Sequence, residues 1–220
     1  MKKNINENIS NIKNDGNYYF IKPFDISSSY CSFAETWKIV NKVYKEIDDV
    51  SDARLMQSFF DNAKFGYISY SSWKTKEAFI KSNSIYTVLK YHNALNGDVS
   101  KIPAHTLYKL ISEEIYKRNS RKKKTLEIII FETDLSKDDK IRLNWKIFCN
   151  NLNEKKGINS ASLYQAIYKK SKYRYVGIID LGDNEADHNI PSNPFKINNE
   201  EKKNGYKTYS SLYRIVKKYS

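Results

Sequence analysis

The chain has 220 residues, of which 40% are hydrophobic and 29% charged, and its formal net charge is +13. With only 7 glycines and 4 prolines it resembles neither a fibrous nor a disordered chain, so we expect a folded protein. Two cysteines give no disulfide framework and no metal-ligand cluster, and no apolar run is long enough to span a membrane. The composition predicts a cytoplasmic location, and the positive charge suits an acidic small molecule or a nucleic acid.

The first half of the sequence alternates between strand-type and helix-type hydrophobic patterns. Strands are expected in four stretches of it: 18–24, 53–60, 65–70 and 106–111. A helix between the first two strands is indicated by apolar residues that recur every three or four positions: Phe33, Trp37, Val40, Tyr44 and Ile47. A second helix is expected over 75–90. This order is the ferredoxin-like β-α-β-β-α-β pattern, which leaves one face of the sheet without helices.

The second half repeats the first at an offset of 108 residues. Residues 33–73 align with 141–181 without a gap, and 9 of the 41 positions are identical. Trp37 and Trp145 occupy the same position, and both are expected in the core. Ser136 is the candidate N-cap of the second helix-type pattern. Strands are expected in four stretches of this half: 126–131, 161–168, 173–179 and 210–216.

These patterns predict an α+β fold made of two ferredoxin-like β-α-β-β-α-β units fused in tandem. The second helix of unit two is expected to be shortened or replaced by a loop, because its stretch is polar and contains two prolines. The two bare sheet faces are expected to bury each other, as an internal pseudo-dimer. The predicted parts are a polar tail at 1–16, unit one at 17–112, a basic linker at 113–125 and unit two at 126–220.

Two motifs of unit one carry a family resemblance. The segment Phe20-Ile21-Lys22-Pro23-Phe24 looks like the opening strand of the antibiotic biosynthesis monooxygenase (ABM)-like dimeric α+β barrels. Trp73-Lys74-Thr75-Lys76-Glu77-Ala78-Phe79 resembles the Trp-x-Ser-x-Glu-Ala-Phe segment of the same family. The resemblance implies an intramolecular dimeric α+β barrel, with a pocket between each sheet and its helices. Members include cofactor-independent oxygenases of phenols and quinones, and haem-degrading enzymes.

The resemblance implies a site in unit one that oxidises an aromatic or phenolic small molecule, with molecular oxygen as co-substrate and no cofactor or metal. Lys22, where the family tends to have Asn, would stabilise anionic charge. The catalytic candidates are Trp73, Lys22, Tyr70 and His92, and the substrate-binding candidates are Tyr67, Tyr108 and Phe24. Haem cleavage is not expected, because Asn83 stands where haem-degrading relatives have a histidine. Leu181 replaces Trp73 in unit two, so one active unit is expected.

Other interpretations of the same residues remain open. Trp73 can be a structural cap, His92 an exposed polar residue, and most of the 18 tyrosines packing residues. The chain can also be a non-catalytic small-molecule-binding or scaffold protein of this fold. A third hypothesis is an RNA-recognition-like protein, since residues 65–70 resemble the aromatic strand on which such domains stack bases. An RNA-binding sheet is exposed, whereas a barrel sheet is covered.

Overall fold

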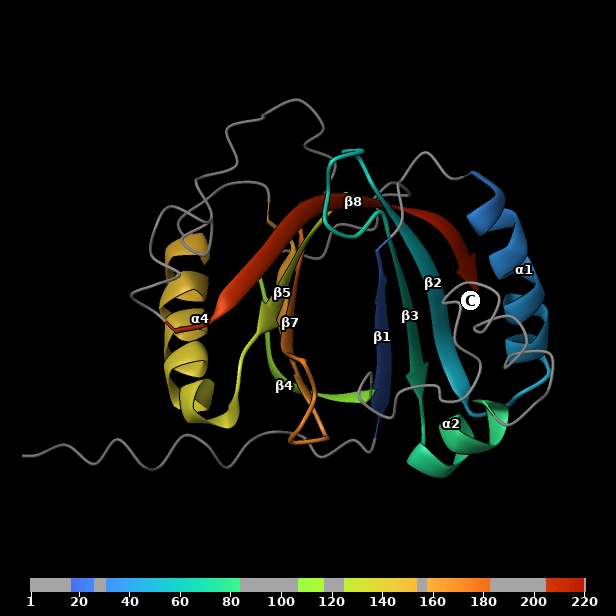
Figure 1. The fold of residues 1–220 in the computed structure, drawn as a ribbon, viewed down its shortest axis with the longest axis horizontal. Helices are drawn as coiled ribbons and strands as arrows, with labels where there is room; N and C mark the ends of the chain where they lie inside the picture. Colours follow the sequence, from blue (N-terminus) through green and yellow to red (C-terminus); the bar gives the residue numbers. More distant parts are fainter. Residues whose placement is uncertain are drawn as a thin grey trace, which may run out of the picture.

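Eight strands form a closed barrel in the order β1-β3-β2-β8-β5-β7-β6-β4. The computed structural model describes residues 17–25, 31–83, 107–116, 125–153, 158–182 and 205–219. The strands are β1 (Tyr18–Phe24), β2 (Val50–Ser58), β3 (Tyr67–Trp73), β4 (Leu107–Ile115), β5 (Thr125–Glu132), β6 (Ser160–Ala166), β7 (Tyr173–Asp180) and β8 (Lys207–Tyr219). The helices are α1 (Cys31–Lys45), α2 (Lys76–Asn83), the 3-10 turn η3 (Leu135–Lys137) and α4 (Asp138–Asn153). Helices α1 and α4 lie outside the barrel on opposite sides (Figure 1).

Every strand and α-helix that falls within the described residues was expected from the sequence, with shifts at the ends, whereas the 3-10 turn η3 was not expected. Strand β1 matches its expected bounds, and β4 and β8 are both longer than expected. Because β4 continues to Ile115, three residues assigned to the linker lie in a strand. Residues 84–90 of the second helix, most of the linker, the stretch 183–204 and the tail 1–16 lie outside the described residues.

The two long strands, β4 and β8, close the barrel by pairing with strands of both halves. Strand β4 pairs with β1 at Tyr108 and Leu107, then with β6 from Tyr108 to Ile115. Strand β8 pairs with β5 along its first part and with β2 along its last part, and it arches across the molecule in Figure 1. The strands therefore form one continuous ring, which agrees with the barrel that the family resemblance implied, and the two sheets share their closing strands. Sharing the closing strands leaves no open sheet edge between the halves.

The barrel interior is an apolar core to which both halves contribute. Its buried members come from strands and from the β2–β3 turn, and no residue of α1 or α4 belongs to it. They are Tyr19, Ile21, Met56, Phe65, Ile68, Tyr70, Tyr108, Leu126, Ile128, Ile130, Tyr164, Ala166, Val176 and Tyr213. Alternate residues of each strand point inward, which is why β1 contributes Tyr19 and Ile21 to the interior while Phe20 packs outside. The inner sheet faces are thus covered, as expected.

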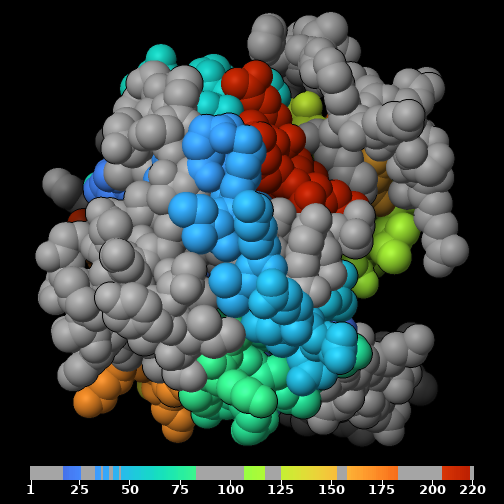
Figure 2. Space-filling model, turned by 90° about the vertical axis from the view of Figure 1, so that its right-hand side faces the viewer, coloured from blue at the N-terminus to red at the C-terminus, as the bar shows by residue number. Residues whose placement is uncertain are grey.

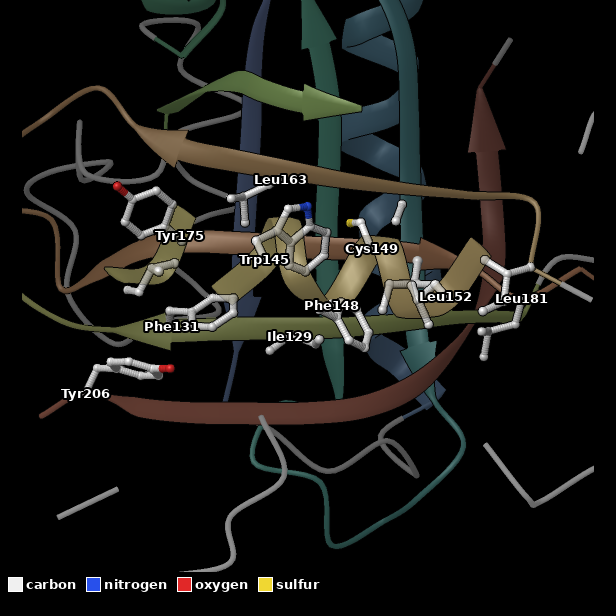
Figure 3. Packing of buried hydrophobic residues seen from close by; sticks show 14 residues of the cluster. Ile129, Phe131, Trp145, Phe148, Cys149, Leu152, Leu163, Tyr175, Leu181 and Tyr206 are labelled. Carbon is white, nitrogen blue, oxygen red and sulfur yellow. The ribbon is translucent and has the colours of Figure 1, made fainter. Parts of the chain in front are cut away.

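Two further cores lie outside the barrel, one under α1 and one under α4. The core under α4 gathers Trp145, Phe148, Cys149 and Leu152, whose side chains point toward the strands (Figure 3). Gly177 is required there, because a Cβ atom at this position would lie 2.4 Å from Cζ3 of Trp145. The expectation that both tryptophans are core residues is confirmed, since Trp37 and Trp145 are each 1% exposed.

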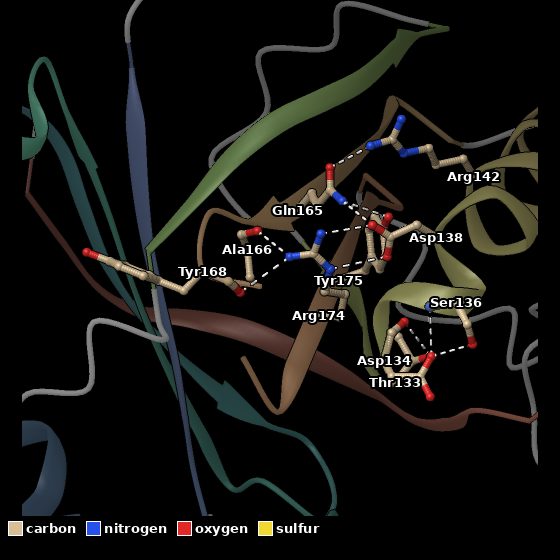
Figure 4. Close-up of polar contacts among 10 residues, drawn as sticks. All are labelled: Thr133, Asp134, Ser136, Asp138, Arg142, Gln165, Ala166, Tyr168, Arg174 and Tyr175. Carbon is tan, nitrogen blue, oxygen red and sulfur yellow. Dashed lines mark hydrogen bonds and ion pairs between the residues drawn. The ribbon is translucent and has the colours of Figure 1, made fainter. Parts of the chain in front are cut away.

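A buried charge network ties the start of α4 to the β6–β7 turn (Figure 4). The Arg174 guanidinium donates to both carboxylate oxygens of Asp138, at 3.2 and 2.8 Å. It also donates to the carbonyl oxygens of Ala166 and Tyr168. Just before α4, Asp134 caps the 3-10 turn η3 by accepting from the backbone N–H of Ser136, so Ser136 lies inside that turn and not directly before α4, where it was expected as the N-cap. The network satisfies the Arg174 guanidinium and two carbonyl groups of the turn, although the buried Ser171 hydroxyl of the same turn has no hydrogen-bond partner among the described residues.

Candidate active site

The layer under α1 contains a buried lysine, Lys22 of strand β1, which pairs with Ser69 of β3. Side chains of β1 alternate between the two faces of the sheet. Tyr19 and Ile21 face the barrel interior, so Phe20, Lys22 and Phe24 face α1. Lys22 is 7% exposed, and its Nζ lies 5.2 Å from the centre of the Phe24 ring. Desolvation lowers the pKa of Lys22 to about 8. No carboxylate among the described residues pairs with this ammonium group.

A row of hydroxyl groups on β3 faces the same layer. Ser69 is the ladder partner of Lys22, and Ser71 is the partner of Phe20. Two indole N–H groups reach this row: Trp37 Nε1 donates to Ser69 Oγ at 3.1 Å, and Trp73 Nε1 donates to Ser71 Oγ at 2.8 Å. Each serine accepts from an indole and keeps its own proton to donate. The lysine therefore lies beside hydroxyl groups that are already oriented.

Tyr44 completes the polar cluster from the helix side. Its ring meets the Trp73 ring edge to face, with centroids 5.2 Å apart. Burial raises the pKa of the Tyr44 phenol, and the nearby Ser71 hydroxyl only partly offsets this effect. No group among the described residues makes a hydrogen bond of good geometry to the Tyr44 hydroxyl. A buried hydroxyl without such a bond is costly, which sets this position apart from ordinary packing.

The polar cluster (Lys22, Tyr44, Ser69, Ser71 and Trp73) has no equivalent in the core under α4. The ladders place Ile129 opposite Gly177 where the first half places Lys22 opposite Ser69. The other three positions, at the offset of 108, are Leu152, Ile179 and Leu181. The second core buries one acid on β5, Glu127, which accepts from Ser210 at 2.9 Å and lies two residues before Ile129. The polar cluster is therefore specific to the first half.

The sequence-predicted site residues divide between the two faces of the sheet. Trp73, Lys22, Tyr67 and Phe24 all face α1, and all four are buried. Tyr70 and Tyr108 instead point into the barrel interior. The structure therefore places the first four on one face of the sheet, with Trp73 opposite Tyr18, four residues before Lys22 on β1, and separates them from the last two by the thickness of the sheet. His92 lies outside the described residues.

Two of the residues that face α1 have packing roles that the second half shares. Tyr67 accepts from Gln57 Nε2 at 3.0 Å, and the same pair recurs as Gln165 and Tyr175 at 2.9 Å. Phe24 packs against Phe33 with ring centroids 4.8 Å apart. The Gln–Tyr pair therefore stabilises both layers in the same way, and it does not distinguish a site.

The inward-facing Tyr70 belongs to a second buried polar group, inside the barrel. Arg54, which forms an ion pair with Asp52, lies over the Tyr70 ring at 5.4 Å. Burial, followed by the neighbouring Tyr164, raises the pKa of Tyr70. Tyr108, farther along the interior, donates to the carbonyl oxygen of Tyr173 at 3.0 Å, which explains its orientation.

Strand β3 does not provide the exposed aromatic surface on which RNA bases would stack. Every residue of β3 is buried, and Tyr67 is 1% exposed. The strand that resembles a stacking platform has one face under α1 and the other inside the barrel. It cannot stack bases in this conformation.

The described residues hold neither a metal-ligand cluster nor a membrane-spanning helix. Within them, His, Cys, Asp and Glu side chains form no group of three or more that could hold a metal ion. None of the helices in the same ranges is long and apolar enough to cross a membrane.

Comparison with known proteins identifies the fold. No protein-family model matches the sequence, and no curated protein sequence matches it significantly. Among solved structures, an anthrone oxidase-like protein aligns with a TM-score of 0.64 and 9% identity, covering 94% of each chain. A mutant chlorite dismutase from Candidatus Nitrospira defluvii, in complex with cyanide, aligns at 0.53 with 10% identity, covering 93% of this chain and 92% of its own.

A third structure is a ferredoxin-fold protein related to antibiotic biosynthesis monooxygenases from Listeria monocytogenes. It aligns with a TM-score of 0.49 and 12% identity, covering 92% of this chain and 96% of its own. The fold expected from the family resemblance is supported by the anthrone oxidase-like structure, which aligns at a TM-score of 0.64. At these identities the likeness extends to the fold alone, and the chemistry must be argued from this chain's own residues.

Proposed function

We propose that the protein is a cofactor-independent, monooxygenase-like enzyme that oxidises an aromatic or phenolic small molecule in the layer under α1. The observation that carries the proposal is the buried Lys22, which has no carboxylate partner among the described residues and which the second half replaces with Ile129. A buried ammonium is expensive unless something pairs with it. An anionic substrate would supply that partner.

The residues of the polar cluster suit this role in different ways. The Lys22 ammonium would pair with the phenolate or carbanion of the substrate, whose own electrons would then reduce molecular oxygen. Ser69 and Ser71 would donate hydrogen bonds to substrate oxygens, while the Trp73 ring would form an aromatic wall. Tyr70 and Tyr108 are left out of this proposal, because a molecule on the α1 face cannot touch side chains inside the barrel.

The tandem origin of the two halves is part of the proposal. Both halves show the same strand order, β1-β3-β2 and β5-β7-β6, and both carry a core tryptophan and a Gln–Tyr pair at the same positions. Under this proposal the second half acts as a built-in partner that closes the barrel. It predicts that each half will superpose on one subunit of a homodimeric ABM-like barrel.

Oxygen uptake by the full chain tests the enzymatic proposal. Wild-type protein would be given a panel of anthrones, quinols and naphthols in an oxygen electrode, beside the variant Lys22→Ile. Isoleucine is chosen because Ile129 occupies the matching position in the other half. We expect at least one substrate to be consumed, with a loss of about 100-fold in rate for the variant. Ile129→Leu, on the far side of the barrel, is the matched control and should keep the wild-type rate.

Two outcomes would count against the proposal. Absence of uptake with the whole panel would reject an oxygenase of these substrates, and an unchanged rate in Lys22→Ile would reject the site. Binding of the same compounds without oxygen consumption would instead favour the non-catalytic binding protein. The presence of Lys22, where the family resemblance leads one to expect Asn, gives that second candidate its support.

A further inference from the structure

We propose that Lys22 is also a nucleophile, which condenses with a small apolar aldehyde or ketone to form an imine under α1. This goes beyond the oxygenase proposal, because it assigns a covalent reaction to the amine and holds whether or not oxygen is consumed. The placement of Lys22 is that of a reactive lysine: the side chain is 7% exposed, between Phe20 and Phe24. Lysines desolvated in apolar surroundings are the ones that form Schiff bases.

The charged and titratable groups around Lys22 leave its amine without an acidic neighbour. The titratable groups that the described elements turn toward this layer are tyrosines: Tyr44 and Tyr67 are buried in it, and Tyr18 and Tyr168 pack against it partly buried. The carboxylates of the two covering helices, Glu35 on α1 and Glu77 on α2, are exposed. Glu35 lies at the surface near Lys217 of β8, at 3.8 Å, where α1 and the end of β8 run side by side (Figure 2). Nothing in the described layer therefore holds the amine in its protonated form.

The fraction of neutral amine follows from this environment. With a pKa of about 8, roughly a tenth of Lys22 is neutral at pH 7. An exposed lysine with an ordinary pKa is neutral in fewer than about one molecule in a thousand at the same pH. Lys22 should thus react with carbonyl compounds on the order of 100 times faster than an equally accessible surface lysine.

Ser69 is placed to assist the condensation. The Nζ lone pair attacks the carbonyl carbon, a C–N bond forms, and the carbonyl π electrons move to oxygen, which takes up a proton. The carbinolamine then loses its hydroxyl group as water while the C=N bond forms, and the two protons that the amine gives up balance those that the departing water gains, so the reaction needs no oxidant or reductant. The Ser69 hydroxyl accepts from Trp37 and can donate its own proton to the carbonyl oxygen, directly opposite Lys22 on the ladder.

Reductive trapping on the full chain tests this inference. Benzaldehyde would be added at neutral pH, followed by sodium borohydride, and the products would be read by intact mass and peptide mapping. We expect one predominant benzyl adduct, on Lys22, with a labelling rate that rises with pH and levels off near pH 8. Lys22→Arg keeps a cation but cannot form the imine, so the adduct should disappear. Lys109→Arg removes a half-buried lysine that lies 3.7 Å from the Tyr18 ring and should leave the labelling unchanged.

A second variant separates chemistry from folding. Ser69→Gly introduces the residue that the other half has at Gly177, and it should slow trapping at Lys22 at least about tenfold without changing the pH at which the rate levels off. Labels spread over many lysines, or an unlabelled Lys22, would overturn the inference. Trapping without oxygen uptake would support the imine and contradict the oxygenase proposal. Oxygen uptake without trapping would support the oxygenase and contradict the imine.

Discussion

The two helix-covered layers of this barrel share a scaffold and differ in what they bury. Each has a buried tryptophan from its long helix packed against its sheet, but Trp37 donates to a serine while the Trp145 ring lies close against a glycine. The layer under α4 shows that the fold does not require a lysine at the position of Lys22, because Ile129 serves there. The polar cluster under α1 is therefore best explained by function. Buried polar groups that the fold can do without support the proposed site.

The largest expected effect comes from the charge network that belongs to the second half alone. Arg174→Ala should lower the free energy of unfolding by about 3 kcal/mol or more, because Asp138 is left half-buried without its partner. Denaturant unfolding measures this change. Arg142→Ala, which removes an exposed bond to Gln165, is the control and should cost well under half as much. Equal effects of the two substitutions would show that burial does not govern this network.

A smaller loss is expected when the two tryptophan sites are made alike. Gly177→Ser copies Ser69 into the second half, where the new side chain would collide with the Trp145 ring. The free energy of unfolding should fall by about 1–3 kcal/mol through overpacking. Ser69→Gly in the first half should cost less, because it removes one hydrogen bond and creates no collision. The reverse ranking would contradict the geometry of both layers.

Lys22→Ile should change stability in the opposite direction. At pH 7 the variant should be more stable by about 1–3 kcal/mol, because it no longer buries an ammonium group. The pKa of Lys22 is lower in the folded protein than in the unfolded chain, so between about pH 8 and 10 the unfolded chain binds more protons. Wild-type stability should consequently rise with pH across that window, and the advantage of the variant should shrink.

The difference in stability between the wild type and Lys22→Ile separates the effect of Lys22 from that of the buried tyrosines. Burial raises the pKa of Tyr44 and Tyr108, so both proteins should lose stability once the unfolded chain begins to ionise its tyrosines near pH 10. Thermal unfolding at several pH values up to about 9.5 gives the comparison. A constant gap between the two proteins over this range would mean that Lys22 titrates normally.

The smallest effect should be the same in both halves. Tyr67→Phe and Tyr175→Phe each remove the hydroxyl that accepts a hydrogen bond from a glutamine, and each should cost about 1 kcal/mol. Chemical unfolding of the two variants side by side tests the match. A cost at Tyr67 more than twice that at Tyr175 would show that the first pair has partners beyond the shared scaffold.

Much of the fold could be predicted because its signals are local. The spacing of Phe33, Trp37 and Tyr44 predicted α1, and the offset of 108 transferred that helix to the second half. The closure of the ring could not be predicted in this way. Strands β4 and β8 each pair with strands of both halves, and these pairings join residues far apart in the sequence, such as Tyr108 with Ala166 and Tyr213 with Ser58. No local sequence pattern encodes them.

The candidate site was predicted in part. Family motifs pointed to Trp73 and Lys22, which the structure places in the same layer, but the serines of β3 and Tyr44 were missed because they resemble ordinary strand and core residues. A signal for two of them existed in the sequence. Residues 67, 69, 71 and 73 share one face of a strand, which groups Ser69 and Ser71 with Trp73 and puts Tyr70 on the opposite side.

The shared closing strands have a consequence for how such a barrel can change. In a barrel made from two identical subunits, any substitution is present twice. The cost in stability of burying a charge would then apply to both halves of the barrel. In this chain β4 and β8 join two halves of different sequence, so Lys22 and its hydroxyl neighbours occur on one side only. A single polypeptide can thus keep an apolar layer under α4 that maintains the fold, while the layer under α1 buries polar groups.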